Sequence, residues 1–197
     1  GSVNGVMGVG GLIGFYQYGY PVASSNSYWN TTTSGQATSA SVETGLTSAQ
    51  MLIASSFAGF NFTSTPGAAG WVIVNADGTL QTGSSNTAGA TFPMLASEYS
   101  NTIFNAHQLQ LMVLAPAANY TLANDIDATG TGGTGDVWGS AGFVPVSTFT
   151  GSFDGQGHII RNLTINQPNT SMNVGLFGNA GTGAVISNVG LVGAGVS

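Results

Sequence analysis

The sequence predicts a mainly β fold: a right-handed parallel β-helix, or solenoid, with a small non-repeat module that contains a short helix and a hairpin. Two observations lead to this prediction. Between residues 149 and 196, short runs of alternating apolar residues recur and are separated by turns rich in glycine and asparagine. The same stretch has no 3.6-residue periodicity, so a helical solenoid is excluded. Stacked coils bury apolar side chains that a single coil cannot, because equivalent residues lie about 4.8 Å apart along the stack.

The clearest repeat is a six-residue phrase. Residues 160–165 and 186–191 share the pattern apolar-x-Asn-apolar-x-apolar, at an offset of 26 residues. The phrase Gly-Leu-apolar-Gly also returns, at 11–14, 175–178 and 190–193. If the offset equals one coil, Asn162 and Asn188 are neighbours on adjacent coils, and their amides hydrogen-bond along the stack.

Strands are also expected outside this stretch. Residues 3–20 alternate glycine with apolar and aromatic residues, and we predict strands of terminal coils there, continued by a strand at 27–29. The Ser/Thr/Gly-rich residues 31–44 are typical of a loop. In the middle of the chain, residues 71–74 and 79–80 flank an Asp-Gly pair, which predicts a hairpin.

Two short helices carry start signals. One is expected at residues 47–57, where Thr47 and Gln50 match a capping box. The other is expected at 105–112, with Asn105 as N-cap and Gln108 as its capping-box partner. The elements divide the chain into three parts: the end of a solenoid array (3–33), a non-repeat insert or linker module (34–104), and a capping helix with the start of a further array (105–197).

Composition narrows the function classes. The chain has 7 acidic residues, 1 basic residue, a net charge of −6 and no cysteine. A typical domain is about 25% charged, whereas this chain is 4% charged, so neutral polar residues must cover its surface. The negative charge argues against nucleic acid and anionic membranes as partners. No apolar run is long enough for a transmembrane helix, so we expect no membrane insertion.

Residues 149–158 (Phe-Thr-Gly-Ser-Phe-Asp-Gly-Gln-Gly-His), 174–178 (Val-Gly-Leu-Phe-Gly) and 186–193 (Ile-Ser-Asn-Val-Gly-Leu-Val-Gly) resemble the GLUG-type repeats of large secreted bacterial adhesins. Those adhesins are similar to filamentous haemagglutinin and are exported by two-partner secretion. The resemblance implies a secreted protein of the bacterial cell surface, with an outer-membrane transporter as partner of the full-length protein. It also implies a structural or adhesive role in attachment, biofilm or virulence, with a host or matrix glycan or protein as ligand. Because the chain opens and closes inside repeat phrases, we expect it to be a fragment.

Two groups of residues are candidates for binding. Asp125, Asp127 and Asp136 supply the carboxylate oxygens that Ca²⁺ prefers, although their spacing matches no established calcium motif and solvated turns are the alternative. The rings of Tyr16, Tyr18, Tyr20 and Trp29 are candidate carbohydrate contacts, with burial in the core as the alternative.

Catalysis is the competing function class. A carbohydrate-active enzyme on a β-helix scaffold, either a polysaccharide lyase or a glycosidase, needs two or three carboxylates, or carboxylates with Ca²⁺ and a basic residue. The candidate carboxylates are Asp125, Asp127, Asp136 and Asp154, the last of them in an Asp-Gly turn. The single arginine, Arg161, lies inside a repeat strand, and the chain has no lysine. We therefore expect no enzymatic activity and no cofactor apart from the candidate calcium.

Overall fold

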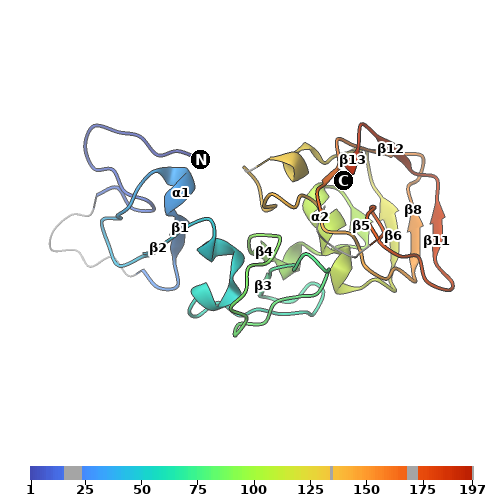
Figure 1. Ribbon diagram of the computed structural model, residues 1–197, viewed down its shortest axis with the longest axis horizontal. Coiled ribbons are helices and arrows are strands. Elements are labelled where there is room, and N and C mark those ends of the chain that lie inside the picture. The colour runs from blue at the N-terminus through green and yellow to red at the C-terminus, as the bar shows by residue number, and fades with distance from the viewer. Residues whose placement is uncertain (16–23, 134, 168–172, 197) are drawn as a thin grey trace.

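The computed structural model describes residues 1–15, 24–133, 135–167 and 173–196, which form short strands and helices joined by many turns (Figure 1). Most of the strands pair in parallel. The strands are β1 (Tyr28–Asn30), β2 (Thr44–Leu46), β3 (Trp71–Val72), β4 (Met94–Leu95), β5 (Thr102–Ile103), β6 (Asn119–Leu122), β7 (Ile126–Asp127), β8 (Ser152–Asp154), β9 (Ile159–Arg161), β10 (Thr164–Ile165), β11 (Val185–Ser187), β12 (Gly190–Val192) and β13 (Gly195–Val196). The helices are α1 (Thr31–Ser34), η1 (Gln50–Leu52), η2 (Ala54–Ser56), η3 (Ala96–Glu98), α2 (Ala106–Gln110), η4 (Leu111–Leu114) and η5 (Thr129–Gly132).

The C-terminal half contains a strand stack, which we define as three adjoining parallel sheets. The largest has the order β5-β6-β8-β11, and these strands lie side by side in Figure 1. The second has the order β7-β9-β12, and the third pairs β10 with β13. Tyr120, Phe153 and Ile186 pair in series at intervals of 33 residues. We call the passage of the chain from one strand to its parallel partner a coil. The predicted parallel strands of this region are thus confirmed.

The predicted coil length is wrong. The register pairs Ile160 with Leu191, an interval of 31 residues rather than 26. Asn162 accordingly lies beside Gly193, and the Asn188 amide instead donates to Asp154 Oδ1 at 3.0 Å. Both asparagines have a left-handed backbone, with φ of 60° and 53°. Asn162 makes the corner between β9 and β10, whereas Asn188 makes the corner between β11 and β12, so the two copies of the phrase mark different corners of a coil.

The two ends of the strand stack differ. At the end formed by β5, helix α2 and helix η4 contribute Leu109 and Met112, both fully buried, to the core of the stack. Asn105 caps α2 by accepting from the Gln108 amide at 2.9 Å, as the sequence predicts. At the opposite end, the outermost strands expose apolar side chains to solvent. Ile186 is 44% exposed, and the others are Val185, Leu191, Val192 and Val196.

The middle of the chain is a compact non-repeat region. Strands β3 and β4 pair antiparallel, and the predicted hairpin is present as a Val74–Leu80 bridge closed by a turn around Gly78. The capping box of Thr47 and Gln50 also forms, at 2.9–3.2 Å. The single helix predicted at 47–57 is instead two short 3₁₀ helices, η1 and η2, because Ile53 between them is extended.

The N-terminal part differs most from its prediction. The strand at β1 is confirmed, and it pairs in parallel with β2. Residues 3–15 contain no strand; they hydrogen-bond to the segment 34–40 through backbone groups instead. Residues 16–20, the rest of that prediction, lie outside the described part of the chain. The loop expected at 31–44 begins with helix α1, because Asn30 caps it and Gly35, at φ of 70°, ends it.

Hydrophobic contacts connect the predicted parts. One buried cluster contains Val72 and Met94 from the middle region together with Leu111 and Val144 from the C-terminal half. The β1–β2 pair likewise spans the predicted boundary at residues 33 and 34. The middle region therefore packs against both of its neighbours in the sequence.

Candidate functional site

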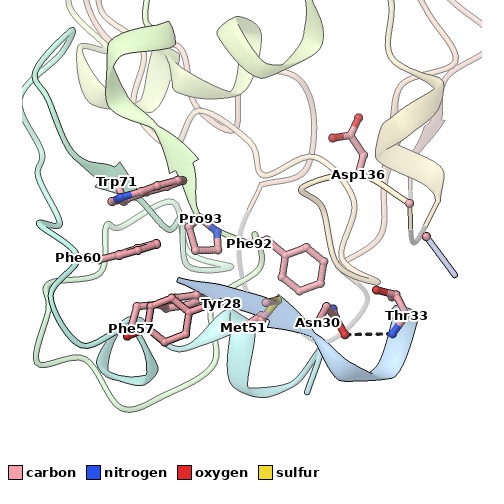
Figure 2. A pocket seen from close by; sticks show the side chains of 12 residues that line it. Tyr28, Asn30, Thr33, Met51, Phe57, Phe60, Trp71, Phe92, Pro93 and Asp136 are labelled. Carbon is pink, nitrogen blue, oxygen red and sulfur yellow. Dashed lines mark hydrogen bonds between the residues drawn. The ribbon is translucent and has the colours of Figure 1, made fainter. Parts of the chain in front are cut away.

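A cavity of about 350 Å³ lies at the junction of β1, the middle region and the segment before Trp138 (Figure 2). Its walls are mainly aromatic or apolar. The lining residues are Gly1, Tyr28, Asn30, Thr33, Met51, Phe57, Phe60, Trp71, Phe92, Pro93, Gly135 and Asp136. A mostly apolar cavity of this size with a few polar groups at its edge has the general character of a small-ligand site.

The aromatic wall is a packed cluster rather than a set of separate rings. The rings of Phe60 and Trp71 stack at 4.5 Å with 7° between their planes. Tyr28 meets Phe57 and Phe60 edge-on at 5.0 and 5.3 Å, and its hydroxyl donates to the Ala58 carbonyl at 2.7 Å. Because these rings pack against one another, they can present their flat faces to a ligand at the cavity wall. They do not surround a space in which a cation could be held.

The polar groups at the cavity edge are largely committed to the fold. Asn30 Oδ1 accepts from the amides of Thr32 and Thr33 at 3.0 and 3.1 Å, which starts helix α1. Asp136 Oδ1 accepts from the Val137 amide at 2.7 Å and from the His107 ring. Among the lining residues that the structure describes, Asp136 supplies the one carboxylate, so this edge does not present the pair of carboxylates that glycoside hydrolysis uses.

The predicted carbohydrate contacts fall elsewhere. Trp29 is 8% exposed, packs against Gly11 and Gly45, and donates its indole N–H to the Gln36 carbonyl at 3.0 Å. It is therefore a core residue, the alternative considered above. Tyr16, Tyr18 and Tyr20 lie outside the described residues. The aromatic cluster of the cavity was not predicted from the sequence, because Tyr28 and the segment 57–71 lie apart in the chain and only the fold brings their rings together.

The three predicted calcium ligands have separate partners. Asp125 accepts from Arg161 Nη2 at 2.9 Å and from the Ile159 amide at 3.1 Å. Asp127 accepts from Thr129. Among the described residues, no group of three or more His, Asp or Glu side chains is arranged to hold a metal ion. Asp136 in particular is a partner of His107.

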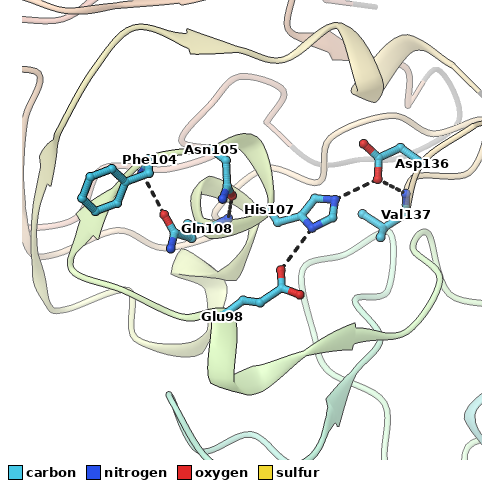
Figure 3. Close-up of polar contacts among 7 residues, drawn as sticks. All are labelled: Glu98, Phe104, Asn105, His107, Gln108, Asp136 and Val137. Atoms are coloured by element: carbon cyan, nitrogen blue, oxygen red, sulfur yellow. Dashed lines mark hydrogen bonds and ion pairs between the residues drawn. The ribbon is translucent and has the colours of Figure 1, made fainter.

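The interaction of His107 with two carboxylates is a feature that sequence reasoning missed (Figure 3). Its Nδ1 lies 3.1 Å from Glu98 Oε2, and its Nε2 lies 2.8 Å from Asp136 Oδ1. Burial by itself lowers the pKa of His107, but the hydrogen bonds and charges of Asp136 and Glu98 outweigh it and raise this pKa above its ordinary value of 6.5. We name Glu98, His107 and Asp136 the histidine clasp.

Comparisons with known proteins give one partial match. The chain is 47% identical over 74 residues, 37% of its length, to halomucin from Haloquadratum walsbyi. These 74 residues are 1% of halomucin, so the matched protein is several thousand residues long and the chain spans a very small part of it. No family model matches, and no solved structure matches. In the described ranges, each helix falls short of the length and apolarity needed to cross a bilayer.

Proposed function

We propose that the chain is a structural, adhesive segment of a large secreted or surface-exposed protein, in which stacked coils of a right-handed parallel β-helix space and present the rest of the molecule. The observation that carries the proposal is the in-register parallel pairing of successive coils. Tyr120, Phe153 and Ile186 occupy one position in three neighbouring strands, and Ile126, Ile160 and Leu191 occupy another. Such stacking is a regular way to build a long, stiff body from short units.

The open end of the stack supports continuation by further coils. Phe153, Ile160 and Ile165 have no exposed surface. Their partners in the outermost coil are Ile186 and Leu191, at 44% and 47% exposure, and Val196 at 48%. A further coil would bury these side chains as the outermost coil buries those beneath it, and apolar burial is the main force that holds such repeats together.

The similarity to halomucin, a large surface-associated protein, is compatible with a surface role. The more specific part of the proposal is a GLUG-repeat segment of a filamentous-haemagglutinin-like adhesin that uses two-partner secretion at the bacterial surface. It rests on the repeat phrases of the sequence alone, since halomucin belongs to an archaeon. A glycan or protein of the host or matrix is the proposed ligand of the whole protein.

The described contacts favour no catalytic function. Asp154 Oδ1 accepts from the Gln156 amide at 2.9 Å and from Asn188 at 3.0 Å, so it acts as a turn residue. Asp125 is likewise held by Arg161 and the Ile159 backbone. Carboxylates held in this way organise corners of the coils. We therefore propose a non-enzymatic role.

The proposal can be tested by adding one coil. Because Ile165 pairs with Val196, a second copy of residues 166–196 placed after Val196 continues the chain in register. We expect the extended protein to unfold at higher urea concentration, because the copy buries the exposed Ile186, Leu191 and Val196 of the present outermost coil. The control is an extension with the same residues in scrambled order.

Two results would contradict the proposal. The first is an extended protein whose urea midpoint equals that of the scrambled control, which would show that the open end does not accept a coil. The second is turnover of a polysaccharide that Asp154→Asn abolishes, which would favour a carbohydrate-active enzyme.

A further inference from the structure

The histidine clasp joins three separate parts of the fold. His107 belongs to α2, the helix at the end of the strand stack. Glu98 ends helix η3, which follows β4 of the middle region. Asp136 lies in the segment after η5, and it lines the aromatic cavity. The two carboxylates come from segments 9 and 29 residues away from the histidine.

The geometry specifies the protonation of the ring. Both ring nitrogens of His107 face carboxylate oxygens, at 3.1 and 2.8 Å. A carboxylate only accepts hydrogen bonds, and neutral imidazole has a single N–H, whereas imidazolium donates from both nitrogens. Both contacts are therefore hydrogen bonds only when the ring is protonated. In the neutral ring, one nitrogen lone pair would face a carboxylate.

The surroundings of the ring contain no competing charge. Among the described residues, Glu98 from η3 and Asp136 from the segment after η5 are the charged groups that face it. Helices α2 and η4 carry no other charged side chain. The remaining neighbour is the ring of buried Trp138, edge-on at 5.4 Å. The exposed fractions of the three clasp side chains are 30% for the histidine and 38% and 39% for the carboxylates, so water can reach the ring and exchange its proton.

We propose that the histidine clasp is a proton-dependent connection between the middle region and the capped end of the strand stack. With His107 protonated, the ring holds Glu98 and Asp136 together. When it loses a proton, the tautomer with hydrogen on Nε2 keeps the shorter bond to Asp136, which the Val137 amide also orients. The hydrogen bond to Glu98 is then lost, and helix η3 stays joined to the capped end through the packing of its buried Ala96. Protonation thus sets how firmly the two parts are joined.

The chain offers a clean way to measure this, because it has two histidines, His107 and His158. The ¹⁵N chemical shifts of both rings are followed by NMR as a function of pH. We expect His107 to titrate above 6.5 and to show the Nε2–H tautomer when neutral. Glu98→Gln and Asp136→Asn should each lower its pKa by at least about half a pH unit, since each removes one negative partner. The ring signals of His158, whose carboxylate contact is with Asp125, should be unaffected by either substitution and serve as the internal control.

A second measurement tests the connection itself. A raised pKa in the folded state stabilises the fold at low pH, and this stabilisation is lost as the pH rises through that pKa. The urea midpoint of the parent should therefore fall between about pH 5 and about pH 9, and that of His107→Gln should fall less. His158→Gln is the comparison variant, because the His158 ring contacts the single carboxylate Asp125, and its fall should stay closer to the parent's than that of His107→Gln does.

Three outcomes would overturn the proposal: titration of His107 at or below 6.5, a pKa that neither carboxylate variant changes, or the same fall in urea midpoint for His107→Gln as for the parent. If His107→Gln does not fold, the NMR titration of the parent and of the carboxylate variants decides.

Discussion

Replacing the buried amide of Gln110 should destabilise the protein strongly. This side chain at the end of α2 has no exposed surface. Its Oε1 accepts from the Trp138 indole at 2.9 Å and from the Val144 amide at 2.8 Å, and its Nε2 donates to the Val144 carbonyl at 3.0 Å. Gln110→Met keeps the side-chain volume similar but removes the partner of three groups: the Trp138 indole N–H, the Val144 amide and the Val144 carbonyl. Trp138 and Val144 are both fully buried, so water does not replace the lost partner.

The expected magnitude follows from those three groups. Each buried polar group left without a partner costs about 1–3 kcal/mol, so even the lower end of the range gives about 3 kcal/mol for Gln110→Met. Gln108→Met, on the same helix, is the matched control. Its Oε1 accepts from the Phe104 amide in an exposed position, where water can replace it, so the loss should stay below about 1 kcal/mol.

The assay is urea unfolding followed by circular dichroism, with the slope of the transition compared between variants. We expect equal slopes, with the midpoint of Gln110→Met far below that of Gln108→Met. If the unfolding free energies of the two variants differ by less than about 1 kcal/mol, the three hydrogen bonds of Gln110 to Trp138 and Val144 do not contribute to stability as expected, which refutes this prediction.

Three further predictions concern a buried side chain, the stability of the protein at low pH, and calcium binding. Phe153→Ala should cost about 3–5 kcal/mol of unfolding free energy, because the ring is fully buried; Ile186→Ala, its partner in the exposed coil, should cost clearly less in the same urea titration. The hydrogen bond from the Ile159 amide, with the contacts of His158 and Arg161, holds the pKa of Asp125 below its ordinary value of 3.8. The resulting stabilisation is fully present above pH 3.8 and is lost as the pH falls through the lower pKa of Asp125 in the folded protein. Thermal unfolding should therefore show that Asp125→Asn loses less stability than the parent on acidification. Millimolar calcium chloride should leave the melting temperature equal to that in sodium chloride of the same ionic strength; a calcium-specific rise would contradict the assignment of the three aspartates to separate partners.

Local signals in the sequence predicted local structure well. The capping box of Thr47 and Gln50 forms as expected, because its partners lie within one turn of chain. Asn105 caps the Gln108 amide as expected, but the Gln108 side chain accepts from the Phe104 amide instead of the Asn105 amide, so only half of that box forms. The parallel strands of the C-terminal half were also predicted, since alternating apolar residues and sharp turns are encoded locally. The helix expected at 47–57 was broken by the extended Ile53, whose branched side chain does not favour a helix.

Non-local features could not be predicted in the same way. Asn162 and Asn188 occupy the same place in the repeated apolar-x-Asn-apolar pattern and have the same left-handed backbone, yet they form different corners. Which corner stacks on which depends on the pairing of the whole coil. The histidine clasp depends on chain segments that only the fold brings together. A signal was present nonetheless: of the 7 acidic residues of the chain, four lie within residues 98–136 together with His107.

The ladder hydrogen bonds of the strand stack have a mechanical consequence. They point along the direction in which the coils follow one another. A pulling force between the capped end and the open end therefore acts on the hydrogen bonds between each pair of neighbouring coils. The outermost coil, whose apolar side chains are partly exposed, should detach first, and the coils beneath it should stay folded until it has unwound. With 33 residues between paired strands, each event would lengthen the chain by about 110 Å. A body built in this way extends in steps under load and re-forms from its capped end when the load is removed.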